Sequence, residues 1–192
     1  MTLVVLLRGV NVGGHRTFRP KQLAEQLKQL GMVNIGAAGT FVVRKKASQT
    51  EVRKALERRL PFKTQIVMCR GRDILALVSS DPFSREKKDS RIVRFVSVLA
   101  KRPRIEPGYP LVLPQGGPWL VKLIGRRDRF VLGMYRRHMN TIRYLGTTDD
   151  EFDVPVTTRN WNTITAIAEV LSTGITSTRK NGGKHLTKEK NR

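Results

Sequence analysis

The sequence predicts an α+β fold of two small subdomains, in which helices pack on mixed or antiparallel sheets, and three observations support this. The run Leu3–Leu7 is apolar and rich in β-branched residues, as in a strand buried on both faces. Strand-like and helix-like segments alternate over residues 1–83. From residue 92 onward the pattern changes to strands joined by turns.

The first subdomain, residues 1–83, is expected to have the element order β-α-β-α-β-α. After the first strand, leucines at helical spacing predict a helix, with a proline in its first turn and a glycine at its end. This helix is expected over residues 20–30. It is followed by an expected strand over 40–43, a helix over 50–60, a strand over 64–70 and a helix over 73–78.

Residues 84–91, SREKKDSR, are charged and predict a linker to the second subdomain, residues 92–172. Strands are expected at 92–99 and 109–114, followed by a hairpin that turns at the sequence GRRD and by a closing helix. Residues 173–192 carry little apolar content and an excess of basic residues, which predicts a disordered tail.

The charge of the chain is strongly positive. There are 37 Lys and Arg against 15 Asp and Glu in 192 residues, a formal net charge of +22. Such an excess attracts polyanions, so nucleic acid is the first partner to consider; the alternative is a fold that simply carries a basic surface. Because the basic residues are dispersed, phosphate contact is favoured over base reading. The candidate contacts are Arg44, Lys45, Lys46, Arg126, Arg127, Arg129, Arg136 and Arg137.

The stretch LLRGVNVGGHRTFRP, residues 6–20, places glycines after a buried strand and could present backbone N–H groups to a phosphate. Its spacing matches neither the dinucleotide nor the Walker pattern, so the glycines are also explained by a tight turn. Arg8 at the strand end needs an anion or an acceptor if it points inward. The candidate anion-binding residues here are Arg8, Asn11, Gly13 and Gly14.

A second stretch, TTRNWNT at residues 157–163, precedes the closing helix. Thr158 or Asn160 can cap that helix, and Arg159 offers a fork suited to carboxylate or phosphate. The candidate ligand-binding residues are Arg159, Asn160 and Thr163; the alternatives are an ordinary cap with a surface arginine, or motifs that only fix the junction of the subdomains. If the two stretches meet, they would form a pocket for a small anionic ligand.

Signals for catalysis, metals and cofactors are weak. The single cysteine, Cys69, lies in an expected strand and is typical of a buried hydrophobic residue; it also suits a reducing cytoplasm. The three histidines show no metal-ligand spacing, and the acidic residues around 149–153 are typical of a solvated turn. The apolar N-terminus is too short for a signal peptide or a membrane span. We therefore expect no metal, no cofactor and no membrane contact, and leave open whether the protein is an enzyme.

Four pieces of the sequence, LLRGVNVGG, the leucine helix ending in QLG, DPF at 81–83 and TTRNWNT, resemble the bacterial domain-of-unknown-function family 1697 (DUF1697) up to about residue 172. The resemblance implies an α+β fold of two small ferredoxin-like subdomains and no established activity. Many members carry Ser-Gly-Asn where this chain has Ala38, Gly39 and Thr40. The function expected first is a non-enzymatic, cytoplasmic binding protein for nucleic-acid phosphates, and the alternative is a binding protein or enzyme for a small anionic ligand.

Overall fold

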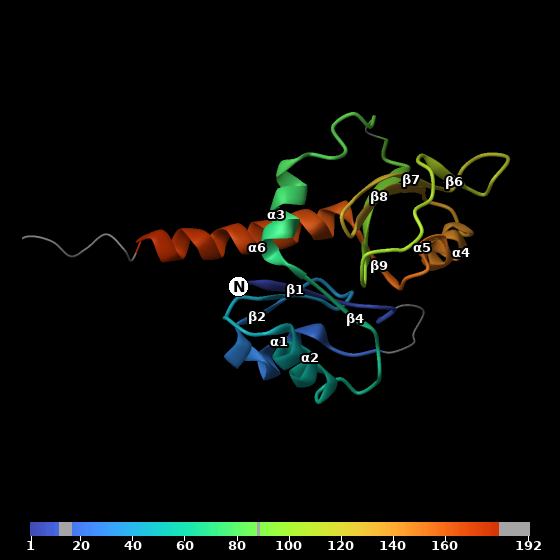
Figure 1. Cartoon of the computed structure of the whole chain (residues 1–192). Helices are drawn as coiled ribbons and strands as arrows, with labels where there is room; N and C mark the ends of the chain where they lie inside the picture. Colours follow the sequence, from blue (N-terminus) through green and yellow to red (C-terminus); the bar gives the residue numbers. More distant parts are fainter. Residues whose placement is uncertain (12–16, 88, 181–192) are drawn as a thin grey trace, which may run out of the picture.

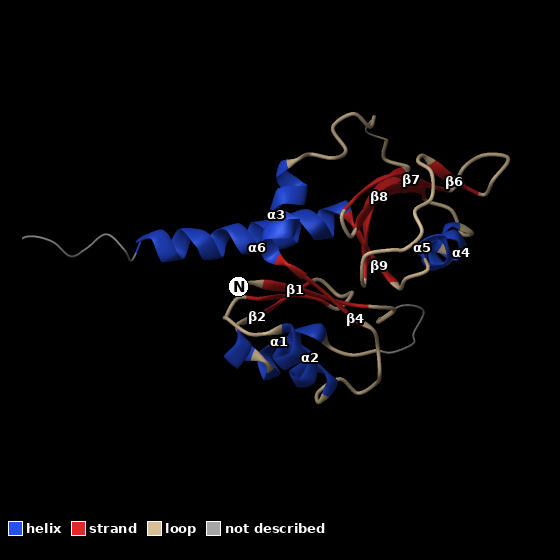
Figure 2. Cartoon of the chain, in the orientation of Figure 1, coloured by secondary structure: helices blue, strands red, loops and turns tan. Residues whose placement is uncertain are grey.

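The structure is a computed structural model that describes residues 1–11, 17–87 and 89–180. Two antiparallel sheets with flanking helices confirm the α+β prediction (Figures 1 and 2). The strand orders are β2-β3-β1-β4 and β6-β7-β8-β5-β9. The elements are β1 (Leu3–Leu7), α1 (Pro20–Gln26), η1 (Lys28–Leu30), β2 (Met32–Ile35), β3 (Thr40–Val43), α2 (Gln49–Glu57), β4 (Ile66–Arg70), α3 (Gly71–Ser79), β5 (Ile92–Leu99), β6 (Leu111–Leu113), β7 (Val121–Arg127), β8 (Phe130–Arg136), α4 (Thr141–Gly146), α5 (Thr148–Phe152), β9 (Val156–Asn160) and α6 (Trp161–Lys180).

The first sheet contains a strand that the sequence pattern did not predict. β2 pairs antiparallel with β3, from Met32 opposite Val43 to Ile35 opposite Thr40, so the two strands form a hairpin. Its turn includes Gly36 and Gly39, both with positive φ. A four-residue strand at a sheet edge, with a polar residue in the middle, is too short for a clear alternating pattern. The expected order β-α-β-α-β-α is therefore corrected to β-α-β-β-α-β-α.

The residues of β1 point alternately to the two faces of the first sheet, and all five are buried. Leu3, Val5 and Leu7 pack in a core that also includes Leu27 beyond α1 and Leu56 of α2. These helices lie on one side of the sheet in Figure 1, whereas α3 and α6 lie on the other. This arrangement explains why the first strand is apolar throughout: each of its faces meets a covering layer.

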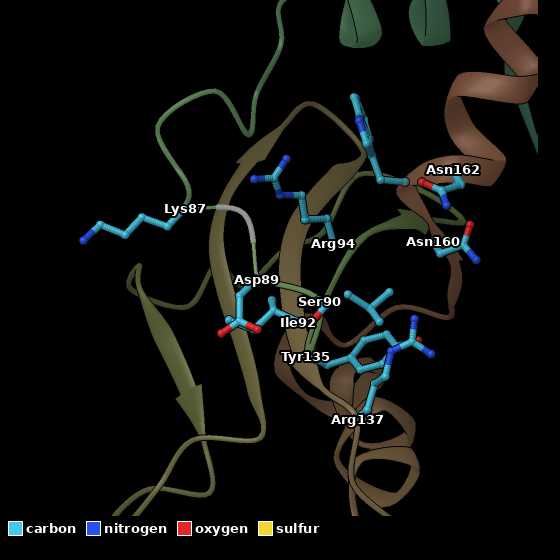
Figure 3. A pocket seen from close by; sticks show the side chains of 11 residues that line it. Lys87, Asp89, Ser90, Ile92, Arg94, Tyr135, Arg137, Asn160 and Asn162 are labelled. Carbon is cyan, nitrogen blue, oxygen red and sulfur yellow. The ribbon is translucent and has the colours of Figure 1, made fainter.

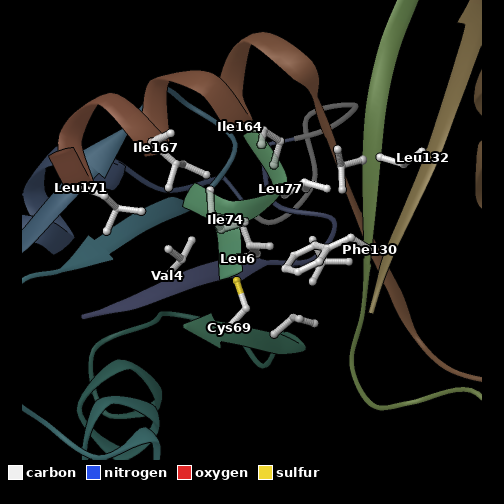
Figure 4. Close-up of a cluster of buried hydrophobic side chains, with 14 of the residues drawn as sticks. Val4, Leu6, Cys69, Ile74, Leu77, Phe130, Leu132, Ile164, Ile167 and Leu171 are labelled. Atoms are coloured by element: carbon white, nitrogen blue, oxygen red, sulfur yellow. The ribbon is translucent and has the colours of Figure 1, made fainter. Parts of the chain in front are cut away.

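The two sheets share a hydrophobic core. Leu6 of the first sheet, Ile74 of α3, Ile167 of α6 and Leu132 of β8 belong to one buried cluster, which also contains Cys69 (Figure 4). The contacts come from both halves of the sequence, and α3 and α6 pack against each other between the sheets. The second sheet uses its opposite face for a further core, in which Phe152 of α5 is buried.

The expected hairpin in the second half is present: β7 ends at Arg127 and β8 begins at Phe130, with Asp128 at positive φ in the turn. The closing helix α6 extends to Lys180, past Thr173, where the composition predicts a disordered tail; residues 181–192 lie outside the described part of the chain. Among the helices of the described ranges, none has the length and apolar character needed to traverse a bilayer.

Candidate functional site

The two predicted stretches meet at the junction of the sheets, through Arg159 of β9. Its Nε donates to the Thr40 hydroxyl at 2.7 Å, and one terminal nitrogen donates to the carbonyl oxygens of Leu7 and Ala38, each at 2.7 Å. The other terminal nitrogen donates to the Thr158 carbonyl at 2.8 Å. Arg159 thus links the last strand of the second sheet to the end of β1 and to the β2–β3 turn of the first.

Arg159 is only 8% exposed, and the oxygens that it contacts carry no formal charge. Burial lowers the pKa of its guanidinium to about 10, so the group remains charged at neutral pH. Every side-chain nitrogen of Arg159 donates to an oxygen of the protein. A ligand would have to displace these bonds, and we therefore assign Arg159 a structural role.

The glycine-containing loop is closed by Asn11. Its amide nitrogen donates to the carbonyls of Phe18 at 3.2 Å and Ala37 at 2.8 Å, and its amide oxygen accepts from the Phe18 N–H at 2.9 Å. Asn11 has a φ of 55°, a conformation that asparagine tolerates better than most residues. The intervening Gly13 and Gly14 lie outside the described residues. The Asn11 amide is thus engaged in holding the loop ends together.

Arg8 contacts the segment before β4. Its guanidinium donates to the Gln65 side-chain oxygen at 3.3 Å, while its main-chain N–H donates to the Gln65 carbonyl at 3.0 Å. The Thr64 hydroxyl donates to the Arg8 carbonyl at 2.6 Å. These contacts lie at the β4 side of β1, whereas Arg159 reaches the β3 side. The two stretches meet, but their arginines bind different parts of the first sheet.

Asn160 and Thr163 form the cap of α6. The Asn160 side-chain oxygen accepts from the Thr163 N–H and from the Thr163 hydroxyl, both at 2.8 Å. The next residue, Trp161, packs edge-on against Phe83 with ring centroids 5.0 Å apart. Phe83 is 1% exposed and belongs to the sequence DPF, so this motif and TTRNWNT also meet.

A cavity of about 490 Å³ opens at the beginning of α6 (Figure 3). Figure 3 shows Lys87 on one side, Asn160 and Asn162 on the other, and Arg94 and Tyr135 between them. The residues lining it are Lys87, Asp89, Ser90, Ile92, Val93, Arg94, Tyr135, Arg137, Asn160, Trp161 and Asn162. We call this space the α6 cavity.

The α6 cavity exists because β9 is shorter than β5. The pairing of these strands ends where Asn160 lies opposite Phe95, so the segment 92–94 of β5 continues beyond β9 and lines the cavity. Arg94 on this segment donates to the Glu86 carbonyl at 2.6 Å, and its guanidinium lies 5.7 Å from the centre of the Phe83 ring. The Glu86 carbonyl and the buried Phe83 ring thus position the Arg94 guanidinium.

The carboxylate in the cavity wall is already paired. Asp89 accepts from the Arg91 guanidinium at 2.8 Å and from the Arg91 N–H at 2.8 Å. These bonds lower the pKa of Asp89 to about 2, so its carboxylate is ionised at neutral pH. The negative charge is paired with the Arg91 guanidinium. The other charged side chains of the described lining, Lys87, Arg94 and Arg137, are all basic.

A second cavity, of about 620 Å³, shares Asp89, Ser90, Ile92 and Arg137 with the first. Its wall adds Arg91, Pro118, Leu120, Arg136 and His138. The Arg136 guanidinium lies over the Trp119 ring, 4.5 Å from its centre. We call the two adjoining cavities the basic basin.

The candidate phosphate contacts lie in three separate places. Arg136 and Arg137 line the basic basin, whereas Arg44, Lys45 and Lys46 are exposed beyond β3, where Arg44 donates to the Val170 carbonyl of α6 at 3.1 Å. Around the β7–β8 turn, Arg127 is exposed, Arg126 pairs with Glu106 at 2.9 Å, and Arg129 joins the sheets by donating to the carbonyls of Met68 and Ala100. The sequence therefore indicated part of the basin.

Lys87 and Arg94 of the basin were not among the candidates. Lys87 lies in the expected linker, and Arg94 is the single charged residue of the mostly apolar strand 92–99. That charge was the available signal, because a cation within a buried strand needs an acceptor or an opening.

Cys69 is 1% exposed and burial raises the pKa of its thiol to about 12, which leaves almost no thiolate at neutral pH. Within the described residues no group of His, Cys, Asp and Glu is arranged to hold a metal ion.

Fold and junction together define an α+β protein whose two sheets share a core and are joined by a buried arginine. A family model described as a protein of unknown function (DUF1697) matches residues 1–107, so the chain belongs to this family. No curated protein matches the chain. Among solved structures, the chain is similar to the conserved bacterial protein SP0830 from Streptococcus pneumoniae, with a TM-score of 0.56 and 16% identity over 88% of this chain and 98% of that one. This likeness concerns the fold alone.

Proposed function

We propose that the protein is a non-enzymatic binding protein that holds nucleic-acid phosphates in the basic basin. The observation that carries the proposal is the charge of the α6 cavity: Lys87, Arg94 and Arg137 line it, and the single carboxylate in its described wall is paired with Arg91. Unbalanced positive charge in a concave site is expected to attract a polyanion. The net charge of +22 supports long-range attraction to the same partner.

The start of α6 adds to this potential. The first residues of the helix, Trp161 and Asn162, form part of the cavity wall. The N-terminal end of a helix carries a partial positive charge, which favours anions in its vicinity. Three residues with cationic side chains and the first turn of a long helix therefore line one cavity, an arrangement suited to phosphate and less suited to a neutral ligand.

We infer that the N-terminal unit is ferredoxin-like, because its order β-α-β-β-α-β and its strand order β2-β3-β1-β4 form two interlocked split β-α-β units. The second unit runs from β5 to β8 with no helix between these strands, so the inference is limited to the first. A cytoplasmic location accords with one buried free cysteine and a nucleic-acid partner.

A small anionic ligand is the second candidate function. The cavity volume of about 490 Å³ is within the range of ligand pockets, and Asn160, Asn162 and Tyr135 offer polar groups beside the cations. For this alternative we propose a site at the start of α6 alone. The side chains of Arg8, Asn11 and Arg159 bond to other parts of the protein, as described above.

The proposal is tested by fluorescence anisotropy with labelled nucleic acid at low and moderate salt. Binding is expected to weaken steeply as salt rises, because each neutralised phosphate releases counterions. The double variant Lys87→Glu/Arg137→Glu is expected to lose at least about tenfold in affinity. The double variant Lys54→Glu/Arg58→Glu makes the same charge change on and just after α2, away from the basin, and serves as the control.

Absence of binding at low salt would overturn the proposal, and so would an equal loss of affinity in both double variants, since the charge would then act without a site. Binding of inorganic phosphate or a mononucleotide at the basin, with no affinity for longer nucleic acid, would instead favour the small-ligand function. Isothermal titration calorimetry with these two probes separates the outcomes.

A further inference from the structure

We propose that the basic basin takes single-stranded nucleic acid, with an unpaired base held in the α6 cavity; this rests on the nucleic-acid function proposed above. The shape of the α6 cavity supports this. Lys87, Arg94 and Arg137 belong to the lining of a recess of about 490 Å³. A duplex keeps its bases paired inside and presents a convex backbone, whereas a single strand can turn a base into a recess.

Aromatic rings lie among the cations of the α6 cavity. Trp161 and Tyr135 line the α6 cavity together with Arg94 and Arg137. Both rings are partly exposed, so each keeps surface available for contact. Binding sites for single strands combine these two features: cations follow the backbone, and aromatic rings stack on bases of any identity.

The two rings are held in place by internal contacts. Trp161 packs edge-on against the buried Phe83, and Tyr135 lies against the buried Phe95 with ring centroids 5.9 Å apart. A ring that is already fixed loses little conformational freedom when a base stacks on it. The same packing places Trp161 next to the cap of α6. Both rings are therefore already in position to stack on a base before nucleic acid binds.

The second cavity gives the strand a path. Arg137 lines both cavities, and the segment 89–92 supplies residues to the walls of both. Beyond it, Arg136 is held over the Trp119 ring, which fixes another cation along the route. A strand that crosses this segment would pass from the cavity lined by Lys87, Arg94 and Arg137 to the one lined by Arg136. Several adjacent phosphates can thus be neutralised without a single continuous groove.

The chain contains two tryptophans, and both lie at the basin, Trp161 in the wall of the α6 cavity and Trp119 beneath Arg136. Intrinsic tryptophan fluorescence therefore reports on this region without any label. A base that stacks in the α6 cavity is expected to change this emission, whereas a polyanion bound near Lys45 and Lys46 is expected to leave it nearly unchanged.

The experiment titrates the full chain with a short single strand and with a duplex of the same sequence, following tryptophan emission and anisotropy together. The single strand is expected to bind about tenfold more tightly than the duplex and to quench the emission. Tyr135→Leu is expected to weaken binding of the single strand about tenfold. Tyr144→Leu is the matched control. Tyr144 of α4 is partly buried and, like Tyr135, packs against the core of the second sheet that contains Phe152.

Thermal unfolding of both variants establishes that they fold. Equal affinity for single strand and duplex, or binding unaffected by Tyr135→Leu, would overturn the inference while leaving the proposed function intact. Failure of both nucleic acids to bind would overturn the proposed function itself. Poly-glutamate that quenches the tryptophans as strongly as the single strand would also overturn the inference, because the basin would then select acidic peptides equally well.

Discussion

Arg159 shows how a single residue type can serve a ligand or the fold. Its planar fork has the geometry that binds carboxylate and phosphate, yet here it satisfies the carbonyls of Leu7 and Ala38 and the hydroxyl of Thr40. These acceptors lie where two sheets abut and where water has little access. A buried charge costs free energy, and the hydrogen bonds that it makes offset part of that cost.

Arg159→Lys is expected to lower the free energy of unfolding by about 3 kcal/mol, because a lysine keeps the charge but cannot reach these oxygens in several directions. Urea denaturation followed by far-UV circular dichroism measures the change. The exposed Arg143 of α4 offers the control Arg143→Lys, for which we expect a change within about 0.5 kcal/mol. A loss at position 159 as small as the control's would show that the bridge does not stabilise the fold.

For single residues, the sequence indicated which polar side chains are engaged in contacts better than it indicated what those side chains bond to. Asn11 was singled out in the loop after a buried strand and Arg159 just before the closing helix, and both are engaged in hydrogen bonds to distant parts of the chain. Arg137 was a candidate, whereas Lys87 and Arg94 were not. The α6 cavity combines segments near residues 87–94, 135–137 and 160–162, and no local pattern records that these segments converge.

At the scale of elements, the β2–β3 turn fits closely against the end of β1. Gly39 has a φ of 66°, and a Cβ atom at this position would lie 2.6 Å from a methyl group of Val10 and 2.9 Å from the Cβ of Leu7. Gly36 in the same turn has a φ of 68° and no atom within 4 Å of such a Cβ. One turn therefore contains two glycines with the same backbone requirement and different surroundings.

Gly36→Ala is expected to cost about 1 kcal/mol, the strain of a left-handed conformation for a residue with a side chain. Gly39→Ala is expected to cost about 3 kcal/mol, because the added methyl group also overlaps buried side chains. Chemical denaturation of the two variants gives the difference directly. Equal losses would mean that Val10 and Leu7 move aside without cost.

The elements with a long, regular pattern were predicted well. β1 is buried throughout, the β7–β8 hairpin is present, and the expected closing helix is α6, which buries Ile164 and Leu171. β2 was missed because four residues at an edge give too little alternation. The end of α6 was expected earlier because a falling apolar content weakens the prediction of a helix without forbidding it.

At the scale of the whole molecule, one core joins segments from both ends of the chain. Val4, Ile74, Phe130 and Ile167 belong to the same buried cluster, which is enclosed by both sheets and by α3 and α6. Arg159 and Arg129 add hydrogen bonds between the sheets. Each sheet loses the cover of one of its faces if the other unfolds, so the two are expected to unfold together.

Two probes within the chain test this cooperativity. Cys69 is the single cysteine, buried in β4 of the first sheet, while the tryptophans lie at the second sheet and the start of α6. Thiol labelling and tryptophan emission are expected to give the same urea midpoint. Two separated midpoints would show that the sheets are independent. A folded reference without denaturant should label very slowly, since almost no thiolate is present.

The position of α6 late in the chain has a consequence for synthesis on the ribosome. The last strand of the first sheet, β4, ends at Arg70. One face of this sheet is covered in part by α6, whose buried residue Leu171 follows about 100 residues later. At typical rates of translation this interval lasts about 5 to 20 seconds. During that time the nascent chain carries an incompletely covered apolar surface, a site for chaperones to bind, until its last helix emerges and completes the covering layer.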